Sequence, residues 1–151
     1  MNIRCLVPVA TALIALHAGS ACAADPEFFA PPAAPGKPLP FSEAVKAPPF
    51  LYVSGSVGLE PGTMELVPGG IQPETRAALE SIKAAVESHG SSMDRVVKCT
   101  VFLADIKEWA AMNEVYVTFF PAGHRPARSA LGTSGLALNA RVEIECIAML
   151  K

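Results

Sequence analysis

Hydrophobic and polar residues alternate along one C-terminal stretch of the chain. Within residues 142–147, the positions read Val142, Glu143, Ile144, Glu145, Cys146 and Ile147. This period of two predicts a β-strand that turns its glutamates to one face and most of its apolar residues to the other. Two carboxylates cannot be buried without partners, so we expect the glutamate face to open to solvent, a partner or a ligand.

Three further strands are predicted upstream. Residues 41–46, 50–56 and 96–103 are expected to be extended, the last two because they are rich in β-branched and aromatic residues. The first of them is expected to be a short edge strand. Residues 58–72 are rich in glycine and proline, which predicts turns with a brief strand at 64–67.

Apolar residues recur at three- and four-residue intervals in two segments, which predicts two amphipathic helices. The first begins at Pro73 and ends at Gly90. The second follows Asp105, with which Glu108 is expected to complete a capping box, and ends before Pro121. The order β-β-α-β-α-β predicts an α+β fold, a single mixed β-sheet covered on one face by two helices. The inner side of the second helix is expected to carry Trp109, Met112, Tyr116, Phe119 and Phe120, with Asn113 nearby.

Residues 1–23 predict a secretory signal peptide. Arg4 precedes an apolar stretch, and Ala21, Cys22 and Ala23 supply the small residues of a cleavage site. The stretch is shorter than the about 20 residues of a membrane-spanning helix. We therefore expect a periplasmic or secreted protein that is free of the membrane after cleavage. A lipoprotein signal with Cys22 as the lipidated residue is the alternative.

The rest of the chain divides into an arm and one domain. Residues 24–40 are rich in proline, which favours extended backbone and predicts a linker or loosely attached arm. Residues 41–151 have a length suited to a single domain. The formal net charge is −2 and the pI is about 5.9, so no basic surface indicates nucleic-acid binding.

Cleavage of the signal would leave two cysteines, Cys99 and Cys146. In an oxidising compartment they permit one disulfide. Both lie inside apolar, strand-like segments, however, and buried free cysteine is common. We therefore expect two free thiols in the core. The three histidines, His17, His89 and His124, are scattered, so no metal site is predicted.

The segment Pro-Ala-Arg-Ser, residues 126–129, is predicted to be a rigid, proline-containing loop, and it supplies the first candidate for chemistry. The guanidinium of Arg128 can bind a carboxylate through two parallel hydrogen bonds. A carboxylate partly withdrawn from solvent, such as Glu143 or Glu145, can accept a proton from water. From the residues alone, an ion pair between Arg128 and one of these glutamates is the simpler interpretation.

This segment, followed at residues 142–145 by Val-Glu-Ile-Glu, resembles the RidA-like (YjgF/YER057c/UK114) family of reactive-intermediate deaminases. The resemblance extends through residues 96–121 and 73–90 back to the Leu-Tyr-Val-Ser-Gly segment at 51–55. It implies a fold like that of the small trimeric chorismate mutases. It also implies a homotrimer with active sites in the clefts between subunits and no metal or organic cofactor.

The resemblance assigns roles to individual residues. Arg128 matches the arginine that binds the substrate carboxylate, and Glu143 matches the glutamate that positions the hydrolytic water. Glu145, on the same strand face, is the competing carboxylate. The other substrate-binding residues that it implies are Asn113, Ser54, Gly55, Ser129 and Ala130.

Four positions depart from the family's pattern. Phe41 replaces a tyrosine, Ala130 a cysteine and Ser56 a glutamine, while Arg125 occupies a position that is often apolar. The arginine that matches the family's carboxylate-binding residue, Arg128, is retained, but the pocket is smaller and has fewer hydroxyl groups. This implies a substrate that is related to the family's substrates but different from them.

The resemblance therefore implies hydrolysis of a small 2-imino acid, or its enamine tautomer, to a 2-oxo acid and ammonia. Two alternatives stay open because the imines cleared by the family arise chiefly in the cytosol, whereas this chain carries an export signal. One is hydrolysis of another small nitrogenous acid. The other is a non-catalytic trimer that binds small carboxylates or partner proteins.

Overall fold

The structure is a computed structural model that describes residues 24–31 and 39–151. The predicted signal peptide, residues 1–23, and residues 32–38 of the predicted arm lie outside the described residues. Among the described helices, none is long and apolar enough to cross a membrane. The strands are β1 (Glu27–Phe29), β2 (Ala44–Ala47), β3 (Phe50–Val57), β4 (Val96–Leu103), β5 (Ala127–Gly132) and β6 (Val142–Met149), and the α-helices are α1 (Ile71–Ser88) and α2 (Trp109–Tyr116).

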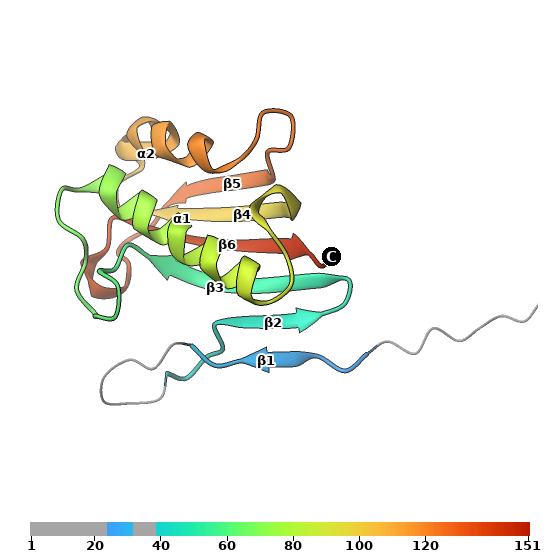
Figure 1. Ribbon diagram of the computed structural model, residues 1–151. Coiled ribbons are helices and arrows are strands. Elements are labelled where there is room, and N and C mark those ends of the chain that lie inside the picture. The colour runs from blue at the N-terminus through green and yellow to red at the C-terminus, as the bar shows by residue number, and fades with distance from the viewer. Residues whose placement is uncertain (1–23, 32–38) are drawn as a thin grey trace, which may run out of the picture.

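The strands form one six-stranded sheet in the order β1-β2-β3-β6-β4-β5. Only β4 and β5 pair in parallel, and the other neighbours are antiparallel. Both α-helices pack on the same face of the sheet (Figure 1). The structure thus confirms the predicted α+β fold with a mixed sheet covered on one face.

The alternation in β6 is confirmed. This strand lies between β3 and β4, and Val142, Ile144 and Cys146 point into the core beneath the helices. Glu143 and Glu145 point to the other face, which none of the described helices covers (Figure 1). We call this uncovered side the open face and the other side the helix face.

The first helix is fixed at both ends. Its buried stripe, which includes Leu79, Ile82 and Val86, packs on the helix face of the sheet. Near its start, the buried carboxylate of Glu74 accepts a hydrogen bond of 2.7 Å from the backbone N–H of Arg141, which ties the helix to the beginning of β6. Gly90, with φ of 90°, follows its end as predicted, because glycine adopts this conformation without steric cost.

The second helix begins differently from the prediction. A turn of 3₁₀-helix at Ile106–Glu108 precedes it, and the Asp105 carboxylate accepts a hydrogen bond from the Lys107 backbone N–H at 2.9 Å. The predicted capping box is wrong, because the Glu108 carboxylate instead pairs with the guanidinium of Arg141. Local spacing could not reveal this partner, which arrives from the loop before β6.

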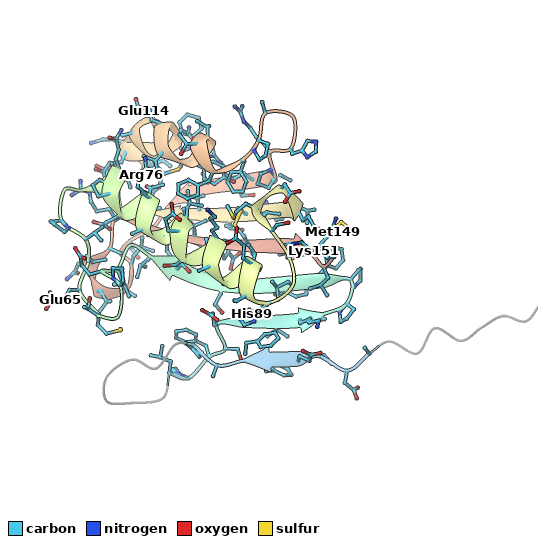
Figure 2. All side chains as sticks on the ribbon, viewed as in Figure 1. Glu65, Arg76, His89, Glu114, Met149 and Lys151 are labelled. Carbon is cyan, nitrogen blue, oxygen red and sulfur yellow. A yellow bond between two sulfur atoms is a disulfide. The ribbon has the colours of Figure 1, made fainter. Side chains whose placement is uncertain are left out.

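Part of the predicted arm belongs to the sheet. Residues Glu27–Phe29 form the edge strand β1, so the prediction of a loose arm is wrong for these residues and β2 is not an edge. The ring of Phe29 stacks on His89 with centroids 3.9 Å apart, and His89 Nε2 lies 2.9 Å from the Glu43 carboxylate. Figure 2 labels His89 at the end of α1 nearest β2.

Two strand boundaries also differ. The strand predicted at 41–46 begins at Ala44 and ends at Ala47. The brief strand predicted at 64–67 is an isolated bridge between Leu59 and Leu66. Both segments flank turns, where glycine and proline mark a change of direction but do not fix the register.

Cys99 and Cys146 form a disulfide, so the prediction of two free thiols is wrong. The two residues are directly opposite each other on the antiparallel pair β4 and β6, with Cα atoms 4.1 Å apart. Both side chains lie in the core beneath the helices. Burial was predicted correctly, but the cross-strand register that places one sulfur beside the other depends on the tertiary fold.

Candidate functional site

Arg128 lies on strand β5 rather than in the loop that the sequence predicted. Its partner in the parallel register is Cys99, whose side chain is buried on the helix face. Residues aligned across a ladder project to the same side of the sheet. The half-buried side chain of Arg128 therefore points toward α2.

Three side chains of α2 surround the Arg128 guanidinium. Nη1 donates a hydrogen bond of 2.6 Å to Oδ1 of Asn113, and Cζ lies 4.5 Å from the ring centroid of Tyr116 and 5.7 Å from that of Trp109. Trp109, Asn113 and Tyr116 are spaced at i, i+4 and i+7, so they share one side of the helix. We call these three residues the α2 clamp.

The clamp places neutral side chains around the guanidinium. Burial raises the pKa of Tyr116 to about 12, so its phenol is neutral near pH 7, and an aromatic face attracts a cation. Among the described residues, the Tyr116 hydroxyl has no hydrogen-bond partner. No carboxylate of the described chain lies within ion-pair distance of Arg128, so the ion pair with Glu143 or Glu145 does not form within one chain.

Glu143 lies on the open face together with Gly55. A Cβ atom built on Gly55 would overlap the Glu143 carboxylate, so the absence of a side chain at this position lets the carboxylate lie across β3. Gly55 is thus required by close approach and not by a positive φ. Ser54 donates a hydrogen bond of 2.7 Å to the Ser42 carbonyl, which is a structural contact.

The structure divides the predicted site residues between the two faces of the sheet. Asn113 and Arg128 meet on the helix face, and Ala130 packs on the same side against the core. Ser129 points to the open face, where it accepts a hydrogen bond of 2.9 Å from Lys98 Nζ. Glu143 also lies on that face. One chain therefore does not bring Arg128 and Glu143 together.

The cavity of the described structure lies away from the predicted site residues, and no group of metal ligands is found. A cavity of about 390 Å³ opens between α1, residues 92–94 and residues 118–121, which follow α2. It lies beside Arg76 (labelled in Figure 2), and none of the predicted site residues lines it. Within the described ranges, no three His, Cys, Asp or Glu side chains are grouped as metal ligands would be.

Sequence reasoning missed the roles of Trp109 and Tyr116. Both were assigned to the apolar inner stripe of the second helix, and Tyr116 is indeed buried, whereas Trp109 is 45% exposed. Their spacing from Asn113 could have revealed these contacts. Asn113 shares one side of the helix with the two aromatic residues, and a polar residue in that position indicates a polar partner.

Comparisons with known proteins agree with this architecture. A family model described as Endoribonuclease L-PSP matches residues 32–150. The chain is 45% identical to RutC family protein UK114 of Drosophila melanogaster, over 75% of this chain and 82% of that protein. It is 42% identical to the 2-iminobutanoate/2-iminopropanoate deaminase of Mus musculus, over 77% and 85%. The crystal structure of yeast Mmf1 superposes with a TM-score of 0.76 at 35% identity, covering 84% of this chain and all of that one.

Proposed function

Because this chain belongs to the Endoribonuclease L-PSP family, the RidA-like family that its sequence resembles, we propose that it hydrolyses small 2-imino acids to 2-oxo acids and ammonia. The name of the mouse relative, 2-iminobutanoate/2-iminopropanoate deaminase, supports this choice of reaction. The single observation that carries it is the Arg128 guanidinium. The α2 clamp holds it, and no carboxylate of residues 24–31 or 39–151 pairs with it.

Arg128 is the anion anchor in this proposal. Asn113 occupies Nη1, and the rings of Tyr116 and Trp109 contact the guanidinium without using its other N–H groups. Those groups form a fork that matches the two oxygens of a substrate carboxylate. Asn113 fixes the orientation of the fork, so less side-chain freedom is lost when the substrate binds.

A second copy of the chain completes the site. Arg128 and Glu143 lie on opposite faces of the sheet, so we propose that Glu143 of one subunit faces Arg128 of its neighbour in a homotrimer. The open face also exposes Tyr52, Leu131 and Met149, three large apolar side chains that a neighbouring subunit would cover. The number of subunits comes from the resemblance alone.

The reaction needs no cofactor, since the carbon of a protonated imine is already electrophilic. The water oxygen bonds to this carbon while one water proton passes to the Glu143 carboxylate. The carboxyl group returns that proton to the nitrogen, the C–N bond breaks, and the carbonyl forms as the hydroxyl proton leaves with the nitrogen as ammonium. Arg128 holds the substrate carboxylate throughout, which keeps the imine carbon facing the water.

We also propose that the protein works outside the cytoplasm. The predicted signal peptide supports this, and so does the buried disulfide, because disulfides persist in oxidising compartments and are rare in the cytosol of most organisms. The source of imino acids in such a compartment would be an amine-oxidising reaction.

The test of the proposed function is imine hydrolysis by the purified protein that begins at Ala24. An amino-acid oxidase generates the 2-imino acids in place, and 2-oxo acid formation is followed. We expect Arg128→Ala to lower kcat/KM about 100-fold, the loss expected when one partner of a charged, hydrogen-bonded pair is removed.

The matched control is Arg125→Ala, which removes an exposed arginine three residues away and should leave kcat/KM within about two-fold, as for a solvated surface charge. A folded wild-type protein that binds 2-oxo acids without accelerating hydrolysis would be a binding module. Equal activity of wild type and Arg128→Ala would remove Arg128 from the site.

Gly55→Ala is expected to separate activity from stability. The new methyl group meets the far end of the Glu143 side chain, which can rotate away, so the fold survives while the carboxylate leaves its position. We expect kcat to fall about 10-fold or more, as for a displaced general base, with a melting temperature within a few degrees of wild type. An unchanged kcat would show that the position of this carboxylate does not matter.

A further inference from the structure

We infer that Trp109 is a specificity-determining residue, an apolar wall for the side chain of the substrate whose carboxylate Arg128 holds. The preferred substrates would then be, among small 2-imino acids, those with an apolar side chain of several carbons. This inference rests on the proposed function and names the substrate class within it.

The position of Trp109 supports this role. Its ring centroid lies 5.7 Å from Arg128 Cζ, yet the side chain is 45% exposed and does not belong to the hydrophobic core. Met112 and Tyr116, which follow it on α2, are buried. Much of the apolar surface of the Trp109 ring is therefore exposed to solvent beside the Arg128 guanidinium, whose remaining N–H groups can bind a ligand.

The exposed apolar surface extends beyond the ring. Ile106 lies three residues before Trp109, is also largely exposed, and approaches Gly132 at the end of β5. A glycine at this point allows Ile106 to lie against the strand, because a Cβ there would come within 3.2 Å of the isoleucine Cβ. Ile106 and Trp109 are thus two exposed apolar side chains on the β5 side of the chain, which we call the apolar rim, and the Arg128 guanidinium lies beside its Trp109 ring.

The chemistry of the substrate fits this arrangement. A carboxylate bound to a guanidinium by two parallel hydrogen bonds of about 2.8 Å lies in the plane of the fork. The α-carbon and side chain of a 2-imino acid then continue away from the fork, within reach of a ring whose centre is 5.7 Å from Cζ. A polar side chain would lose hydration against this rim, whereas each methylene of an apolar one would gain about three- to four-fold in binding.

Substrate length provides the experiment. The imines of alanine, 2-aminobutyrate, norvaline and norleucine are generated by an amino-acid oxidase and presented to wild type, Trp109→Phe and Trp109→Ala. For wild type we expect kcat/KM to rise about three- to four-fold per added methylene. Trp109→Ala should flatten this rise, losing about 10-fold or more for the longest imine and less than about two-fold for the shortest. Trp109→Phe should lie between them.

The matched control is Phe28→Ala, which removes an exposed aromatic ring from β1, at the opposite edge of the sheet from β5. It should leave the dependence on chain length unchanged. An equal loss for all four imines in Trp109→Ala would overturn the inference and leave Trp109 as a residue that only positions Arg128. A wild-type rate independent of chain length would also overturn it.

Binding distinguishes failure of the inference from failure of the proposed function. Trp109 is the only tryptophan in the sequence, so its fluorescence reports ligands at Arg128 directly. We expect 2-oxohexanoate to change this emission in wild type but not in Arg128→Ala. Hydrolysis that depends on Arg128 but not on Trp109 refutes the inference alone. A wild type that neither hydrolyses these imines nor binds the 2-oxo acids refutes both.

Discussion

Two strongly impaired variants, Arg128→Ala and Glu143→Gln, are expected to restore activity to each other when they share one trimer. Each variant keeps the half of the site that the other lacks, because Arg128 lies on the helix face and Glu143 on the open face of the sheet. If each site joins Arg128 of one subunit to Glu143 of the next, a trimer that contains both variants has about a third of its sites intact. Recovery should approach that fraction of wild-type kcat.

The measurement uses co-expression of the two variants with different tags, so that assemblies containing both can be purified. A suitable control replaces Glu143→Gln with Asn113→Ala, which damages the same half of the site as Arg128→Ala. That mixture should stay inactive, since every subunit then has a damaged helix-face half. Mixed assemblies of the first pair that also stay inactive would contradict a site shared between subunits.

Removing the disulfide is expected to lower the free energy of unfolding by about 4 kcal/mol, the chain-entropy value for cross-linking two positions this far apart. Cys99 and Cys146 are separated by 47 positions in the sequence, and the bond joins β4 to β6 beneath the helices. This loss is a large share of the about 5–15 kcal/mol that stabilises a typical domain. Urea unfolding of the wild type and of Cys99→Ala/Cys146→Ala measures it.

A reductant provides the control for this prediction. It should lower the stability of the wild type toward that of the double variant and leave the double variant itself unchanged. Neither sulfur belongs to the proposed site, so kcat should be retained wherever the reduced protein stays folded. Equal stability of the oxidised and reduced wild type would show that the bond contributes nothing to the fold.

The correct predictions of structure rest on periodicity within single elements. The alternation around Glu143, the apolar stripe of α1 and its end at Gly90 all depend on neighbours a few positions away. These features need no knowledge of the rest of the chain. The family resemblance was equally accessible, since its motifs are contiguous in the sequence.

The wrong predictions involve partners that are distant in sequence. Glu108 seemed placed to cap its own helix, but Arg141 offers it a charged partner. Cys99 and Cys146 seemed to be separate core thiols, and the prediction of a loose arm missed the β2 edge that pairs with residues 27–29. In each case the deciding contact spans more than a dozen residues, and periodicity carries no information at that range.

The sequence by itself determined which side chains share a face of each element, because the pitch of a helix and the pleat of a strand are local properties of the backbone. It also identified Arg128 and Glu143 as the candidate pair. Only the tertiary structure decided where the two residues point relative to each other. The parallel register of β5 turns Arg128 toward Asn113, and the antiparallel register of β6 turns Glu143 to the open face. Registers are set by hydrogen bonding and packing between strands that are far apart in the chain. No local pattern could therefore show that Arg128 and Glu143 of one chain lie on opposite faces of the sheet.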